Sequence, residues 1–82
     1  EVVKQAVAAA ARLPGPDGVR LLRQAAASPR WDVRHAAARG MAERRDPALR
    51  EEAARLARSD PDTLVARAFA EAATLLAGRS RR

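Results

Sequence analysis

One stretch recurs along this chain, and its recurrence restricts the folds that the chain can adopt. Residues 28–42, read as a helix, place apolar side chains on one stripe at the i, i+3, i+4, i+7, i+8 spacing of a core-facing surface. The stripe consists of Val33, Ala36, Ala37, Gly40 and Met41. The Val-Lys-Gln-Ala of residues 3–6 lies 30 positions before the Val-Arg-His-Ala of residues 33–36, and Val65 lies 32 positions after Val33. A period near 30 residues in an all-helical pattern is typical of a solenoid.

Breaks rich in proline divide the chain into five predicted helices, at residues 2–13, 17–27, 29–44, 47–58 and 62–77. Asp17, Ser28 and Asp46 carry side-chain oxygens just before helix-favouring residues, so we expect each to cap the helix that follows it. Pro29 and Pro47 suit the first helical position, where the missing N–H costs nothing. The breaks are Pro14-Gly15-Pro16, Ser28-Pro29, Asp46-Pro47 and Ser59-Asp60-Pro61.

The composition predicts a thin core in a single small domain. The chain has 82 residues and 48% of them are hydrophobic, but most of these are alanine and only 2% of the chain is aromatic. Burial must therefore come from many close helix contacts, at ~25 cal/mol per Å² of apolar surface. A second independent core would need a longer chain.

Cysteine is absent, so neither disulfides nor thiolate metal ligands occur. This leaves the redox compartment open, and we take the cytoplasm as the default location. No apolar run approaches the ~20 residues that cross a bilayer, and no signal peptide is visible. The first residue is Glu1 rather than methionine, which suggests a segment of a longer protein. Abundant alanine and arginine, with isoleucine, asparagine and tyrosine absent, suggest a GC-rich bacterial genome.

Several motifs resemble the short bacterial HEAT-like repeats that also occur in phycobilisome-lyase-type proteins. In that family a loop with Asp or Ser and Pro precedes Val-Arg and an alanine-rich helix, and an Asp-Pro turn leads to a second helix. Residues 28–38 match the first part of this pattern, and residues 46–49 and 59–62 match its turns. The first repeat departs from the pattern with Lys4 in place of arginine. In the third repeat, Ala66 separates Val65 from Arg67.

The resemblance implies an all-α fold, a right-handed α-solenoid of HEAT-like helical hairpins with about five helices in the order A-B-A-B-A. We expect one domain over residues 1–78, with repeats at approximately 1–28, 29–59 and an incomplete 60–78, followed by a basic disordered tail at 79–82. The resemblance also implies that Arg34 bonds carboxylates or loop carbonyls of neighbouring repeats. For Trp31 it implies a wedge between adjacent repeats, and the alternative is a recognition residue at an interface.

No constellation of residues points to catalysis, to a metal or to a cofactor. His35 is the only histidine and faces the predicted solvent side, with no second histidine or cysteine to share a metal. Glu51 and Glu52 are adjacent, so on a helix they point some 100° apart and form no catalytic dyad. Glu51 instead stands four residues before Arg55, as a supporting surface pair. We therefore expect a protein that is not an enzyme and has no cofactor.

The formal net charge of +6 is carried almost wholly by arginine. In a HEAT-like stack the second helices of successive repeats line the concave face, which solenoids use for binding. There we expect a partner-binding ladder of Arg20, Gln24, Arg50 and Arg58. Its partner would be an acidic protein surface or a neighbouring domain of a longer parent chain. The alternative is non-specific nucleic-acid binding by the same arginines through phosphate contacts.

The last predicted helix, residues 62–77, is apolar on two adjoining flanks. The flanks contain Leu64, Ala68 and Leu75 on one side and Val65, Phe69, Ala72 and Leu76 on the other. Because the preceding helices cover only one flank, we expect the other to meet a neighbouring domain or a second copy of the chain. In a homodimer, Phe69 and Leu76 would lie near the two-fold axis.

Overall fold

The computed structural model describes residues 2–78, and over this range it contains five α-helices and no strand. The predicted all-α, solenoid-like fold is therefore confirmed. The tail predicted at 79–82 lies outside the described residues. The elements are α1 (Val2–Ala10), α2 (Pro16–Ala26), α3 (Trp31–Arg44), a short 3-10 helix η1 (Pro47–Leu49), α4 (Arg50–Ser59) and α5 (Thr63–Gly78).

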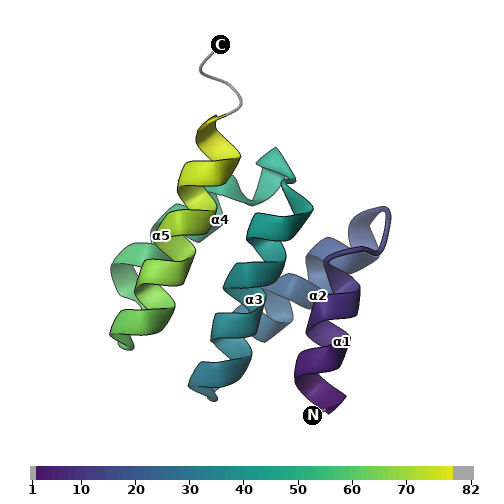
Figure 1. Cartoon of the computed structure of the whole chain (residues 1–82), viewed down its shortest axis with the longest axis horizontal. Helices are drawn as coiled ribbons and strands as arrows, with labels where there is room; N and C mark the ends of the chain where they lie inside the picture. The colour runs from purple at the N-terminus through teal and green to yellow at the C-terminus, as the bar shows by residue number, and fades with distance from the viewer. Residues whose placement is uncertain (1, 79–82) are drawn as a thin grey trace.

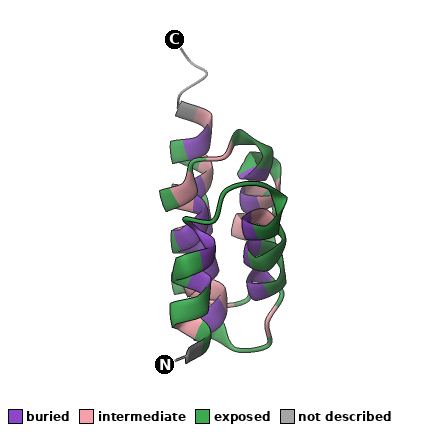
Figure 2. Ribbon diagram, turned by 90° about the vertical axis from the view of Figure 1, so that its right-hand side faces the viewer, coloured by how far each residue is buried: buried purple, intermediate pink, exposed green. Residues whose placement is uncertain are grey.

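The helices form two layers, with α1, α3 and α5 in one and α2 and α4 in the other (Figure 1). The central helix α3 packs against α1, α2 and α5, while α4 packs mainly against α5. The Cα atoms span 38 × 29 × 14 Å, so the molecule is a slab only two helices thick. Buried residues gather on the facing sides of the two layers (Figure 2).

The interior is built from small side chains around a few larger ones. The largest fully buried side chains are Phe69, Leu22, Met41, Leu49 and Val65. Each contributes roughly 1.5–3 kcal/mol relative to an exposed position. The remaining buried positions are largely alanine, as the composition predicts.

Some helix ends differ from the prediction. Helix α1 ends at Ala10 rather than at residue 13, because the chain must turn before Pro14. At the start of α2, Gly15 takes the cap position with φ 78°, a left-handed conformation that suits glycine. Asp17 therefore lies inside the first turn and does not cap the helix.

The predicted Ser28 cap is also wrong, because α3 begins only at Trp31 and Arg30 precedes it without a side-chain cap. The Ser28 hydroxyl instead accepts a hydrogen bond from the Arg30 N–H at 3.1 Å, within the turn. The Asp46 cap is confirmed, since its carboxylate accepts from the Ala48 N–H at 3.0 Å. The segment that it caps is 3-10 rather than α-helical.

The last helix contacts its neighbours through the flank that we expected to stay uncovered. Phe69 and Leu76 are 0% and 3% exposed, so neither can lie at a two-fold axis on the surface of this fold. Leu64 and Leu75, on the other flank, are 58% and 40% exposed. The assignment of Phe69 and Leu76 to self-association is therefore wrong. Its physical reason is that α5 packs against both α3 and α4, which together enclose the larger side chains.

Candidate functional site

An arginine at the start of α3 fixes the loop that leads into α5. The Arg34 Nε and Nη2 atoms donate to the two carboxylate oxygens of Asp60, at 2.8 and 3.2 Å. Arg34 Nη1 also donates to the Ser28 and Pro29 carbonyls, at 3.1 and 3.2 Å. The expectation that Arg34 bonds carboxylates and loop carbonyls is confirmed, and this arginine is therefore not available to a partner.

Arg44, at the opposite end of α3, fixes the loop between α1 and α2 in the same manner. Its guanidinium donates to the carbonyls of Ala10 at 3.3 Å and Gly15 at 2.7 Å, and to that of Leu13. This role was not apparent in the sequence, because the acceptors are backbone atoms about 30 positions away and leave no side-chain pattern.

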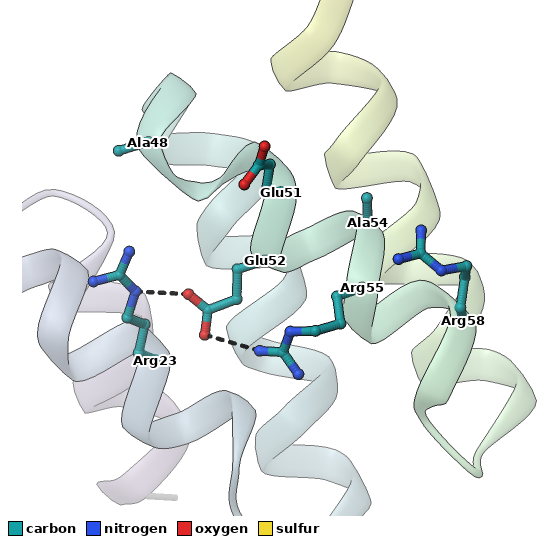
Figure 3. A pocket seen from close by; sticks show the side chains of 7 residues that line it. All are labelled: Arg23, Ala48, Glu51, Glu52, Ala54, Arg55 and Arg58. Carbon is teal, nitrogen blue, oxygen red and sulfur yellow. Dashed lines mark hydrogen bonds and ion pairs between the residues drawn. The ribbon is translucent and has the colours of Figure 1, made fainter.

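A hollow of about 810 Å³ lies between α2 and α4, in the layer where we expected partner contacts. It is lined by Arg23, Ala48, Glu51, Glu52, Ala54, Arg55 and Arg58 (Figure 3). Glu52 is central to it, because one carboxylate oxygen lies 2.6 Å from Arg23 Nε and the other lies 3.7 Å from Arg55 Nη2. Arg55 therefore pairs with Glu52 rather than with Glu51, its predicted partner.

Arg58 lies on the side of this hollow opposite Arg23 (Figure 3). Within residues 2–78 the Arg58 guanidinium has no ion-pair partner, whereas Arg23 and Arg55 share a single carboxylate. The lining thus contains three arginines and two glutamates, one of which already bridges two of the arginines. The hollow presents a surplus of guanidinium groups to solvent.

The other residues of the predicted ladder lie elsewhere on the same two helices. Arg20 of α2 is exposed and forms an ion pair with Asp17 at 2.9 Å. Gln24 of α2 lines an apolar hollow against α1, and Arg50 of α4 lines a third hollow against α5. The four ladder residues therefore do not line one cavity. Their part in binding a partner stays a prediction.

Trp31 is not the wedge that the resemblance implied. Its side chain is 51% exposed, and its ring makes an edge-on contact with the His35 ring at a centroid distance of 6.4 Å and an interplanar angle of 71°. The wedge prediction fails because the alanine-rich interface between α1 and α3 closes without a large side chain. The alternative, an exposed recognition residue, agrees with this position.

The described residues contain no cluster of three or more histidine, cysteine or acidic side chains that could hold a metal ion. Among the described helices, none combines the length and the apolar character that crossing a membrane requires.

The comparisons with known proteins agree with this architecture. The sequence matches the family described as HEAT repeats over residues 1–74. Comparison with the curated proteins and with the solved structures gives no match. HEAT repeats generally mediate protein–protein interaction and are typically non-enzymatic scaffolds. The match extends over most of the chain and over all the helices through α4, so this chain belongs to the HEAT repeat family.

Proposed function

We propose that this chain is a non-catalytic interaction scaffold, and that it binds an acidic protein surface through the face formed by α2 and α4. The observation that carries the proposal is the arginine-rich hollow between these helices. Arg20, Gln24 and Arg50, on the same layer of helices, are proposed as further contacts, and Arg58 joins them within the hollow.

The charges in the hollow favour a carboxylate-bearing partner. Arg23 and Arg55 are held by the single carboxylate of Glu52, so each retains N–H groups that can donate to a second acceptor. Arg58 has its whole guanidinium available within the described residues, and a guanidinium binds a carboxylate through two parallel hydrogen bonds. Glu51 lines the same hollow. It repels a partner whose carboxylates lie next to Glu51 instead of next to the arginines, which makes the face selective among acidic partners.

The test uses a defined acidic probe, a soluble polyglutamate peptide, and measures binding by calorimetry. We expect the double variant Arg55→Glu with Arg58→Glu to lose most of the affinity, because it reverses two of the charges in the hollow. Arg67→Glu is the control for a charge reversal outside this face, since Arg67 is exposed on α5 in the other layer, and each single variant, Arg55→Glu and Arg58→Glu, is compared with it. Equal loss in the control would show a non-specific charge effect and would contradict the proposed face.

Duplex DNA in the same titration tests the nucleic-acid alternative. Phosphate-driven binding falls steeply with salt, with a log–log slope of roughly −0.9 per phosphate contact. If duplex DNA binds more tightly than polyglutamate and shows such a slope through the same arginines, the protein-scaffold assignment is wrong.

A further inference from the structure

We propose that the outer face of the α1–α3 layer carries a second site, which binds one nucleotide unit, meaning an aromatic base with its phosphate. The site is a hollow of about 230 Å³ lined by Lys4, Trp31, Asp32, His35, Ala36 and Arg39. Its residues belong to α1 and α3, so it is independent of the α2–α4 face on which the proposed scaffold function depends.

Trp31 supplies a flat surface for a base. Half of its side chain is exposed, and the only ring contact within the described residues is the edge-on contact with His35. Because the contact is edge-on and the residue is 51% exposed, part of the indole surface is open to solvent. Solvent-exposed aromatic side chains stack on nucleobases whatever the nucleotide sequence, because every base has a π face.

Arg39 supplies the cation for the phosphate. It is exposed, lines the hollow one turn beyond His35, and has no ion-pair partner within residues 2–78. A guanidinium is suited to phosphate because its planar fork can donate two hydrogen bonds at once.

The acidic member of the lining, Asp32, does not oppose an anion here. One of its carboxylate oxygens lies 2.8 Å from Arg30 Nη2 and 3.5 Å from Lys4 Nζ. Partial desolvation raises the pKa of Asp32, but the hydrogen bond and charge of Arg30, followed by those of Lys4, outweigh it and lower the pKa overall. The carboxylate is therefore ionised and neutralised by the cations beside it.

The lining favours a nucleotide over an acidic peptide. A peptide that anchors through an apolar side chain needs an apolar pocket, and Ala36 is the only aliphatic residue of this hollow. Two aromatic rings, an unpaired guanidinium and a neutralised carboxylate instead match a flat aromatic anion. The base could come from a single strand or from a free nucleotide, and the test separates these sources.

The experiment follows the fluorescence of Trp31, which is the only tryptophan of the chain. The probes are an oligothymidylate of about eight nucleotides, thymidine monophosphate, a duplex of the same length and polyglutamate. We expect saturable quenching by the oligothymidylate, because a stacked base contacts the indole. Duplex and polyglutamate should leave the fluorescence unchanged, since duplex bases are already stacked and polyglutamate has none.

Two variants test the assigned roles. Arg39→Glu should weaken oligothymidylate binding by about tenfold or more, because it removes a charged hydrogen bond to the phosphate, whereas Arg67→Glu, on α5, should not. Trp31→Ala should weaken binding of a labelled oligothymidylate, measured by anisotropy, and Trp31→Phe should restore much of it. Circular dichroism shows whether each variant is folded. If Trp31→Ala unfolds the chain, the effect of Arg39→Glu on oligothymidylate binding decides whether this hollow is the binding site.

Quenching by thymidine monophosphate as strong as that by the oligomer would identify a free nucleotide as the ligand, and weaker quenching would identify a single strand. The proposal is overturned if neither probe quenches Trp31, if duplex or polyglutamate quenches equally, or if Arg39→Glu binds like the unmodified chain. Loss of polyglutamate binding by the α2–α4 variants has no bearing on these readouts, so the two proposals fail separately.

Discussion

Arg34 and Asp60 form a two-bond ion pair across 26 positions of sequence, with side chains only 14% and 2% exposed. The pair links the start of α3 to the loop that leads into α5. Arg44 makes the corresponding link at the other end of α3, to the loop between α1 and α2. The central helix thus holds a flanking loop at each end.

Removing the Arg34 side chain should be among the most damaging single changes in the chain. Arg34→Met leaves the nearly buried Asp60 carboxylate without its counter-ion, which costs roughly 3–5 kcal/mol. Arg34→Lys should also destabilise the fold, because an ammonium cannot form the two parallel bonds. Urea denaturation measures both free energies of unfolding. If Arg34→Met unfolds at the same urea concentration as the unmodified chain, the pair has no part in stability.

Arg44 and Arg45 are adjacent arginines with different roles, and they form a matched test. Arg44→Met removes hydrogen bonds to three loop carbonyls and should destabilise the chain by roughly 2 kcal/mol. Arg45 is exposed and has φ 60°, so Arg45→Gly should stabilise the chain slightly, as glycine suits a left-handed helix end. Thermal melts of both variants check this. Equal effects of the two changes would contradict the role given to Arg44.

The two buried glycines, Gly18 and Gly40, should differ in their tolerance of alanine. A Cβ at Gly18 would lie 2.6 and 2.8 Å from the carbonyl oxygens of Ala10 and Leu13, which are backbone atoms and cannot move easily. A Cβ at Gly40 would come too close only to the tip of Leu22, at 2.7 Å, while Ala11 Cβ and the Val7 carbonyl oxygen would lie at ordinary contact distances of 3.6 and 3.8 Å. We expect Gly18→Ala to cost about 1–3 kcal/mol and Gly40→Ala to cost less, because the Leu22 side chain can shift. Chemical denaturation measures the difference, and the reverse order would refute it.

Arg20 and Arg50, which the sequence alone predicts to bind the partner, can be tested separately from the hollow between α2 and α4. Replacing Arg20 and Arg50 together with glutamate should weaken polyglutamate binding, since both are exposed on the layer formed by α2 and α4. The free energy of unfolding should change by no more than about 0.5 kcal/mol, as is usual for surface changes. Calorimetry and a melting curve give the two values. Unchanged affinity would remove Arg20 and Arg50 from the binding face and leave Arg55 and Arg58.

The exposed flank of α5 should govern any self-association of this chain. Leu64→Gln with Leu75→Gln should abolish such association and leave the melting temperature nearly unchanged, because both leucines are exposed. Sedimentation equilibrium over a wide concentration range measures it. By contrast, Phe69→Ser should unfold the chain, since Phe69 is fully buried. A chain that is monomeric at every concentration would show that Leu64 and Leu75 make no contact between copies.

The sequence by itself determined the helices, their order and most of the interior. Proline and glycine set the breaks, and the 3.6-residue period placed Leu22, Val33 and Met41 on core-facing stripes, where the structure buries them. The Val-Arg motif and the proline turns carried the resemblance to HEAT-like repeats, and that resemblance implied the bonds of Arg34. The breaks and the stripes depend on neighbours within a few turns of one helix, so a linear pattern records them.

Only the tertiary structure decided which flank each helix buries and which charges meet. The period showed two apolar flanks on α5, but the position of α3 and α4 selected Phe69 and Leu76 for the core. Spacing favoured Glu51 as the partner of Arg55, whereas the approach of α2 brings Arg23 to Glu52, and Glu52 holds both arginines. Trp31 stays exposed because α1 and α3 pack closely through alanine. Helical periodicity fixes the direction in which a side chain leaves its helix axis. The neighbouring helices decide whether that side chain meets the core, a charged partner or solvent.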